Sequence, residues 1–123
     1  MPENQIGFEV GVAGVTFEGR QSILSALYDA QAAHNAQLTA DLEREPDNRY
    51  DPSAIKVMVS TAAHRVHIGY IPRNLAARLA PKLDAGEPFE IKSVRIIKGA
   101  SDRGTVTYGA RLYVEADRAE EVS

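Results

Sequence analysis

The side chains best suited to chemistry lie close together at positions 47–51. They are a tyrosine ring, two carboxylates, an amide and a guanidinium, from Tyr50, Asp47, Asp51, Asn48 and Arg49. Prolines at positions 46 and 52 fix φ on either side, and Asn and Asp side chains bond their own backbone in turns. The segment is therefore predicted to be a rigid loop. A rigid loop that carries a ring, acceptors and a cation is suited to a small, polar, partly flat ligand.

The same residues also fit a purely structural interpretation. In that interpretation Asp47 and Asn48 cap the turn, Asp51 bonds the backbone near Ser53, and Tyr50 packs against the rest of the fold. The structural interpretation buries the rings of Tyr50 and Phe17 and uses the Asp51 carboxylate fully in bonds to local amides. A ligand-binding role requires an exposed ring, whereas a structural role buries it.

The elements that must position this loop are strands with one buried face. Directly after the loop, Ile55, Val57 and Val59 alternate with Lys56 and Met58, which is the period of a strand. Similar alternations between turn signals predict six strands, at 8–15, 37–44, 55–59, 65–71, 89–98 and 106–114.

Two of these strands have details that the pattern predicts. In the fourth, Val66, Ile68 and Tyr70 are expected to share one side because they alternate with other residues. In the fifth, the apolar phase slips after Ser93, which predicts either a bulge or a strand shared between two sides of the barrel.

Two further segments repeat their apolar residues at helical spacing. The first helix is predicted from Arg20 over about three turns, and its extension through 30–36 stays open. The second has an apolar stripe that includes Leu75 and Leu79, is expected to kink or shorten at Pro81, and ends at Gly86. Six strands and two helices predict a mainly β, α+β domain, a small six-stranded OB-like or modified β-barrel that is partly open.

Length and composition limit the organisation of the chain. Its 123 residues are enough for one buried core and too few for two. We expect a barrel domain over 8–116, an N-terminal extension at 1–7 and an acidic C-terminal tail at 117–123. The sequence has no cysteine, which excludes disulfides and thiolate metal sites. It also lacks a signal-peptide or membrane-spanning pattern, so an intracellular, cytoplasmic protein is expected.

The charge narrows the possible partners. A formal net charge of −3 argues against a protein that coats nucleic acid through bulk electrostatics. It is compatible with a small site that touches a few phosphates.

Several segments taken together resemble the HIRAN domain, over about 8–98. Each is weak alone, but their order and spacing are fairly specific. The segments are Val12 to Phe17 with Arg20 and Gln21, Glu45 to Pro52 followed by Ala54 to Val57, and Ile68 to Pro72 before the second helix. The resemblance implies a modified OB-like barrel that binds single-stranded DNA and captures its free 3′ end. It also implies a stand-alone member of the kind found in bacteria and phages, and it leaves open whether the domain works alone, beside a nuclease, or with a helicase or nuclease partner in trans.

The resemblance also implies roles for individual residues. Phe17 and Tyr50 would stack bases, Asp51 would bond the terminal 3′-hydroxyl, Asn48 would be the polar partner in the turn, and Arg73 would contact a phosphate. Family members can have a basic residue before the first stacking aromatic, where this chain has Thr16. With Lys56 and Tyr70, the predicted DNA-binding set is Phe17, Asn48, Tyr50, Asp51, Lys56, Tyr70 and Arg73.

Two other classes of function stay open from the residues. A metal-dependent hydrolase acting on nucleic acid would use Glu45, Asp47 and Asp51 as Mg²⁺ ligands, with His64 and His67 as ligands or bases. A protein-interaction barrel would instead present exposed aromatic rings to a peptide or to a second copy. The rings concerned are Phe17, Tyr50 and Tyr70.

The binding interpretation is favoured, with no catalytic residue, resident metal or cofactor. A further stacking ring from Tyr108 or Tyr113 is left open, whereas Tyr28 is expected in the core. DNA versus RNA and the oligomeric state are also open.

Overall fold

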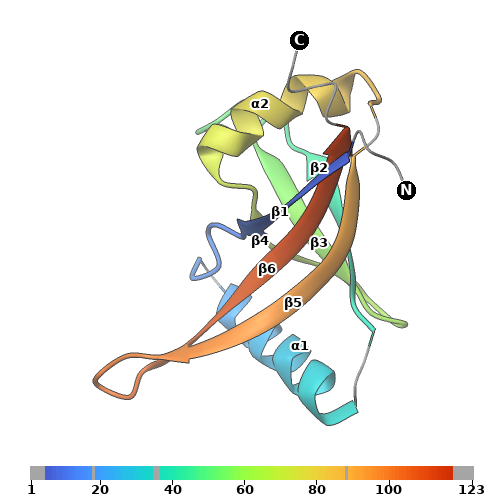
Figure 1. Ribbon diagram of the computed structural model, residues 1–123. Coiled ribbons are helices and arrows are strands. Elements are labelled where there is room, and N and C mark those ends of the chain that lie inside the picture. The colour runs from blue at the N-terminus through green and yellow to red at the C-terminus, as the bar shows by residue number, and fades with distance from the viewer. Residues whose placement is uncertain (1–4, 18, 35–36, 88, 118–123) are drawn as a thin grey trace.

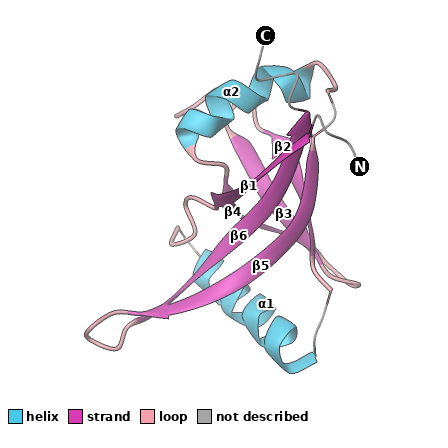
Figure 2. Cartoon of the chain, viewed as in Figure 1, coloured by secondary structure: helices cyan, strands magenta, loops and turns pink. Residues whose placement is uncertain are grey.

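A computed structural model describes residues 5–17, 19–34, 37–87 and 89–117 (Figure 1). Within these residues the chain forms six strands and two helices, which Figure 2 separates by colour. In chain order they are β1 (Gln5–Gly11), α1 (Arg20–His34), β2 (Thr39–Arg44), β3 (Ile55–Ser60), β4 (Arg65–Tyr70), α2 (Arg73–Asp84), β5 (Glu90–Ala100) and β6 (Val106–Asp117). The predicted mainly β, α+β class is confirmed.

The strands form two antiparallel sheets of three strands each. One sheet has the order β1-β6-β5 and the other β2-β3-β4. A bridge between Ala13 and Tyr70 joins them, with two backbone hydrogen bonds of 2.8 Å. The OB-like architecture holds, although the barrel is not closed, because this single bridge is the connection between the sheets in the described residues.

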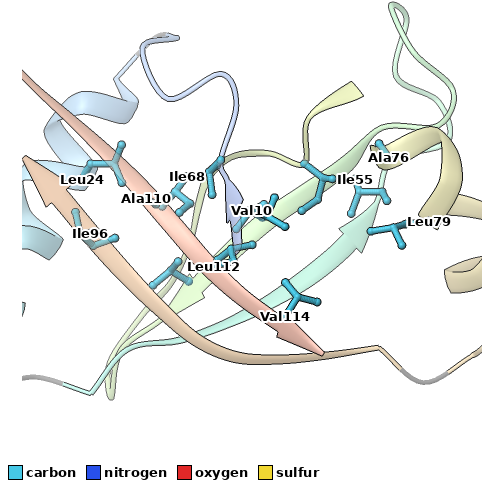
Figure 3. Close-up of a cluster of buried hydrophobic side chains, with 14 of the residues drawn as sticks. Val10, Leu24, Ile55, Ile68, Ala76, Leu79, Ile96, Ala110, Leu112 and Val114 are labelled. Atoms are coloured by element: carbon cyan, nitrogen blue, oxygen red, sulfur yellow. The ribbon is translucent and has the colours of Figure 1, made fainter. Parts of the chain in front are cut away.

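The core lies between the two sheets and is extended by one face of each helix (Figure 3). The alternating residues of β3, Ile55, Val57 and Val59, are fully buried as predicted. Leu24 of α1 packs into the same cluster, as does Leu79 of α2. This packing fixes the strand that immediately follows the loop at 45–54.

The structure shows how far each helix extends. Helix α1 includes residues 30–34, which answers the question left open there as far as His34, since 35 and 36 lie outside the described residues. Helix α2 continues past Pro81 to Asp84. Gly86 follows it with φ +76°, a left-handed conformation that glycine adopts easily, so the predicted helix end is confirmed.

Register shifts mark a bulge in each sheet. The shift in β5 lies between Ile91 and Ser93, so of the two alternatives a bulge is present, but before Ser93 and not after it. The other shift lies between β3 and β4, where Val57 pairs with Gly69 and Met58 pairs with His67, so Ile68 is the extra residue.

The second bulge corrects the prediction for the face of Tyr70. Val66 pairs with buried Val59, whereas Tyr70 pairs with Lys56. Paired residues share a face, so Tyr70 lies on the outer side with Lys56 and not with Val66. The inserted residue, Ile68, is itself apolar and buried, so it fits the alternation in the sequence and the bulge cannot be recognised from that pattern.

The sheet containing β1 begins before the predicted domain start. Gln5 of β1 pairs with Asp117 of β6, while residues 1–4 and 118–123 lie outside the described part. Neither α1 nor α2 is long and apolar enough to cross a membrane.

Candidate functional site

The loop at 45–54 is closed by its own hydrogen bonds. The Glu45 amide donates to the Ala54 carbonyl oxygen at 3.0 Å. Oδ1 of Asn48 accepts from the amides of Tyr50 and Asp51, both at 2.9 Å, and Oδ1 of Asp51 accepts from the Ser53 amide at 2.9 Å. The structural roles considered for Asn48 and Asp51 are therefore present, and they make the loop rigid.

Arg44 anchors the loop from the end of β2. Its Nη1 donates to the Ala54 carbonyl at 2.7 Å, and its Nη2 donates to the Pro52 carbonyl at 3.0 Å. Nε forms an ion pair with Asp84 of α2 at 3.0 Å. The residues predicted for the site did not include Arg44. Its position directly before the loop, where its side chain can reach the loop carbonyls, is the signal that was missed.

Tyr50 and Phe17 present exposed rings beside the loop. Tyr50 is 79% exposed and Phe17 is 61% exposed, so Tyr50 does not pack into the fold. The Arg49 guanidinium lies 5.8 Å from the centre of the Tyr50 ring. Both rings border a cavity of about 500 Å³, called here the larger cavity. It is lined by Gly14, Phe17, Arg20, Glu45, Asp47, Asn48, Arg49, Tyr50 and Tyr70.

A second cavity, the smaller one, has a volume of about 310 Å³ and shares part of its wall with the first. Tyr50 belongs to both, so the two cavities adjoin. Asp51 and Arg73 border only the smaller cavity, and Arg73 Nε lies 3.8 Å from Asp51 Oδ2. The structure therefore brings six of the seven predicted DNA-binding residues to the joined cavities. They are Phe17, Asn48, Tyr50, Asp51, Tyr70 and Arg73.

Arg20 is a cavity residue that was not included in the predicted set. Its guanidinium carbon lies 5.1 Å from the centre of the Phe17 ring and 5.2 Å from that of Tyr70. Its Nη1 also donates to the Gly14 carbonyl at 2.8 Å. The two rings and this carbonyl hold a cation in the wall of the larger cavity. Arg20 was part of the motif that resembles the family, but nothing in the sequence alone placed it between rings.

Glu45 connects the loop to two strands. Its Oε1 accepts from Asn48 Nδ2 at 2.6 Å and from the Tyr70 hydroxyl at 2.9 Å. Its Oε2 pairs with Lys56 Nζ at 3.3 Å. The hydrogen bond from Asn48 lowers the pKa of Glu45 most, with smaller contributions from Tyr70 and Lys56, while partial burial opposes them.

Lys56 is the one predicted DNA-binding residue that borders neither cavity. It pairs with Glu45 and, at 3.6 Å, with Glu43. The hydrogen bond to Glu45 raises its pKa. Its position makes it a counterion for the loop carboxylate.

Tyr70 is held in the wall from two sides. Besides its bond to Glu45, its ring meets the edge of the His67 ring, with centroids 4.9 Å apart and planes at 89°. Burial and the bond to Glu45 raise the pKa of the hydroxyl. Nε2 of His67 lies 2.8 Å from the Gly69 carbonyl oxygen, which fixes the supporting ring.

The residues considered as metal ligands do not form one cluster. Within the described ranges, no group of three or more His, Cys, Asp or Glu side chains is placed to hold a metal ion. His64 is exposed in the turn between β3 and β4, whereas His67 supports Tyr70.

The comparison with protein families identifies the family of the chain. The HIRAN domain model matches residues 8–117. The chain belongs to the HIRAN domain family. HIRAN is a DNA-binding domain, and the joined cavities lie in the segments that carried the resemblance.

One relative links the domain to a larger protein. The chain is 34% identical over 80 residues to the Fanconi-associated nuclease 1 homolog of Oryza sativa subsp. japonica. The match covers 61% of this chain and 8% of that protein, so it concerns a small part of the nuclease. No solved structure matches the chain significantly.

Proposed function

We propose that this HIRAN domain captures the free 3′-hydroxyl end of single-stranded DNA in the two adjoining cavities. The observation that supports this most is the 79% exposure of Tyr50 on a loop whose backbone is fixed by Asn48. A ring held in place can stack a base with little ordering cost. Such stacking contributes roughly 1–3 kcal/mol per base and tolerates any sequence. Phe17 offers a second ring in the larger cavity.

Asp51 supports selection of the strand end. Its Oδ1 accepts from Ser53, while Oδ2 lies 3.8 Å from Arg73, beyond hydrogen-bonding distance. Oδ2 can therefore accept a hydrogen bond from a 3′-hydroxyl. A phosphate in the same place would meet a carboxylate of like charge, so a continuous or 3′-phosphorylated strand is disfavoured.

Three arginines would provide the phosphate contacts. Arg20 and Arg49 border the larger cavity and Arg73 the smaller one. In the larger cavity, Arg20 supplies a cation close to Phe17, where Thr16 supplies none. Each phosphate neutralised in a single strand contributes about −0.7 to the slope of the logarithm of the binding constant against the logarithm of the salt concentration, so three arginine contacts should give a slope of roughly −2.

We also propose that the domain binds DNA without cleaving it, and that a helicase or nuclease acts in trans. One of the carboxylates considered as metal ligands, Glu45, is already engaged by Asn48, Tyr70 and Lys56. A cytoplasmic location stays a prediction from the sequence.

The test is fluorescence anisotropy with labelled strands that end in a 3′-hydroxyl or a 3′-phosphate. The unmodified domain should bind the 3′-hydroxyl strand at least about tenfold more tightly, which corresponds to about 1.4 kcal/mol. Asp51→Asn should remove most of that preference, because a neutral amide no longer repels phosphate. Incubation with Mg²⁺ should leave the strands at full length.

Asp47→Asn is the matched control. It makes the same charge change on the same loop, but Asp47 borders only the larger cavity. It should keep the end preference. Equal affinity of the unmodified domain for both strand ends, or equal losses in the two variants, would contradict end capture through Asp51.

A further inference from the structure

The outer face of the sheet β1-β6-β5 carries side chains that the cavities do not use. In β6, Leu112 and Val114 are fully buried, so Arg111 and Tyr113 point to the opposite side. The register places Tyr113 between Glu9 of β1 and Ser93 of β5. It places Arg111 between Gly11 and Arg95. These residues form one continuous surface, called here the outer face.

Two arginines lie directly opposite each other on this face. Arg95 of β5 pairs with Arg111 of β6, and like charges in that relation destabilise a sheet. The acid next to them, Glu9, lies 3.9 Å from Arg111, and both side chains are at least half exposed, so this pair is weak. Glu115 on the same face pairs with Lys92 instead. The arginine pair would be stabilised by a bound anion.

An aromatic ring lies beside the arginines. Tyr113 is 40% exposed although it stands in the middle of a central strand. A Cβ added to Gly7 would lie 1.9 Å from the Tyr113 hydroxyl oxygen, so the side chain extends across β1. A Cβ on Gly11 would meet nothing within 4 Å. The surface around the ring is therefore low and open enough for a flat ligand.

We propose that the outer face is a second binding surface for single-stranded nucleic acid. One base stacks on Tyr113, and the adjoining phosphates lie over Arg95 and Arg111. Stacking on an exposed ring together with arginine contacts to phosphate is how single strands are commonly bound. The arginine pair favours this occupant, because Arg95 and Arg111 face each other across the two strands and the neighbouring acid Glu9 lies 3.9 Å from Arg111 in an exposed pair.

Only a short segment of the chain separates the outer face from the cavities. Gly11 belongs to the face and Gly14 lines both cavities, and three residues span at most ~11 Å. A strand whose end lies in the cavities can therefore continue onto the outer face. This continuity rests on the proposed function, whereas the binding surface itself does not.

Strand length separates the two sites in an experiment. A strand of about four nucleotides would fill the cavities, and one of roughly 16 would also reach the outer face. Arg95→Gln/Arg111→Gln should weaken binding of the long strand about tenfold and make its salt slope shallower by about 1.4, or two phosphates. Binding of the short strand should not change. Tyr113→Ser should also weaken only the long strand, by about tenfold.

Controls keep the outcome readable. Arg65→Gln/Arg103→Gln removes two exposed arginines from outside the face, one on β4 of the other sheet and one in the turn between β5 and β6, and should leave long-strand binding intact. A long strand blocked by a 3′-phosphate should still depend on Arg95 and Arg111, even if the cavities show no end preference. The melting temperature of the Arg95→Gln/Arg111→Gln variant should not fall, because the variant relieves a like-charge pair.

Three results would overturn the proposal. One is unchanged long-strand affinity in the Arg95→Gln/Arg111→Gln variant, and another is equal losses in the two double variants. The third is self-association of the domain, or binding of poly-glutamate, that depends on Arg95 and Arg111 while nucleic acid has no effect.

Discussion

Replacing Glu45 with alanine is expected to loosen the binding site and to lower the stability of the fold. The carboxylate accepts from Asn48 at 2.6 Å and from Tyr70 at 2.9 Å, and it pairs with Lys56 at 3.3 Å. Hydrogen bonds to a charged group contribute about 1.5–3 kcal/mol each when well formed. The Glu45 side chain is 22% exposed and its ion pair is near the surface, so we expect a total loss of about 2 kcal/mol.

The loss should depend on pH in a defined direction. The folded-state pKa of Glu45 lies below its ordinary value of 4.5, chiefly because of the Asn48 hydrogen bond. The stabilisation is therefore fully present above pH 4.5 and disappears as the pH falls through the folded-state pKa. Thermal unfolding at pH 7 should show a melting temperature lower by roughly 8 °C, and the difference from the unmodified protein should shrink in acid.

Two variants sharpen this test. Glu45→Gln keeps an acceptor oxygen but loses the charge that Lys56 balances, and it should lie between the unmodified protein and Glu45→Ala at pH 7. Asp47→Ala, an exposed acid on the same loop, should have little effect on stability. A Glu45→Ala protein that melts like the unmodified one at pH 7, or a difference that does not change with pH, would refute the role given to Glu45.

Three further predictions concern single positions. Tyr50→Ala should weaken binding of single strands by about 1–3 kcal/mol in anisotropy, with an unchanged melting temperature because the ring is 79% exposed. Gly69→Ala should lower the melting temperature clearly, because a Cβ there would lie 2.4 Å from the Ala13 carbonyl oxygen and disturb the bridge between the sheets. Burial, and then the Arg20 charge, lower the pKa of His67. The stability that neutral His67 provides is therefore complete above pH 6.5 and falls as the pH drops below that value. Unfolding measured at pH 7 and pH 5 should show that His67→Phe loses less stability between these two pH values than the unmodified protein does.

Local chemistry made much of the fold predictable. The alternation of Ile55, Val57 and Val59 identified the strand at the centre of its sheet, and Gly86 identified the end of α2. The rigid loop followed from the way Asn48 and Asp51 bond neighbouring amides. In each case the residues that decide the structure are close in sequence, so the sequence carries the information directly.

Features that depend on register were not predictable in the same way. The alternation in β4 gave Tyr70 the wrong face, because the bulge at Ile68 depends on how β3 and β4 pair. Lys56 pairs with Glu45, and nothing in the sequence alone indicated that these two side chains meet. Arg20 stands on a helix between two rings that belong to other segments. These contacts arise only when distant segments meet.

The bulge explains how one strand can serve both the core and the site. Without it, strict alternation would keep Tyr70 on the side of Val66, toward the core. With it, Ile68 stays fully buried while Tyr70 turns outward to Glu45 and Arg20. The Tyr70 side chain then contacts Glu45 through its hydroxyl and Arg20 through its ring. Deleting Ile68 should therefore lower the stability of the core and leave Tyr70 on its present face, because Ile68 is fully buried and the remaining pairs would keep Tyr70 opposite Lys56.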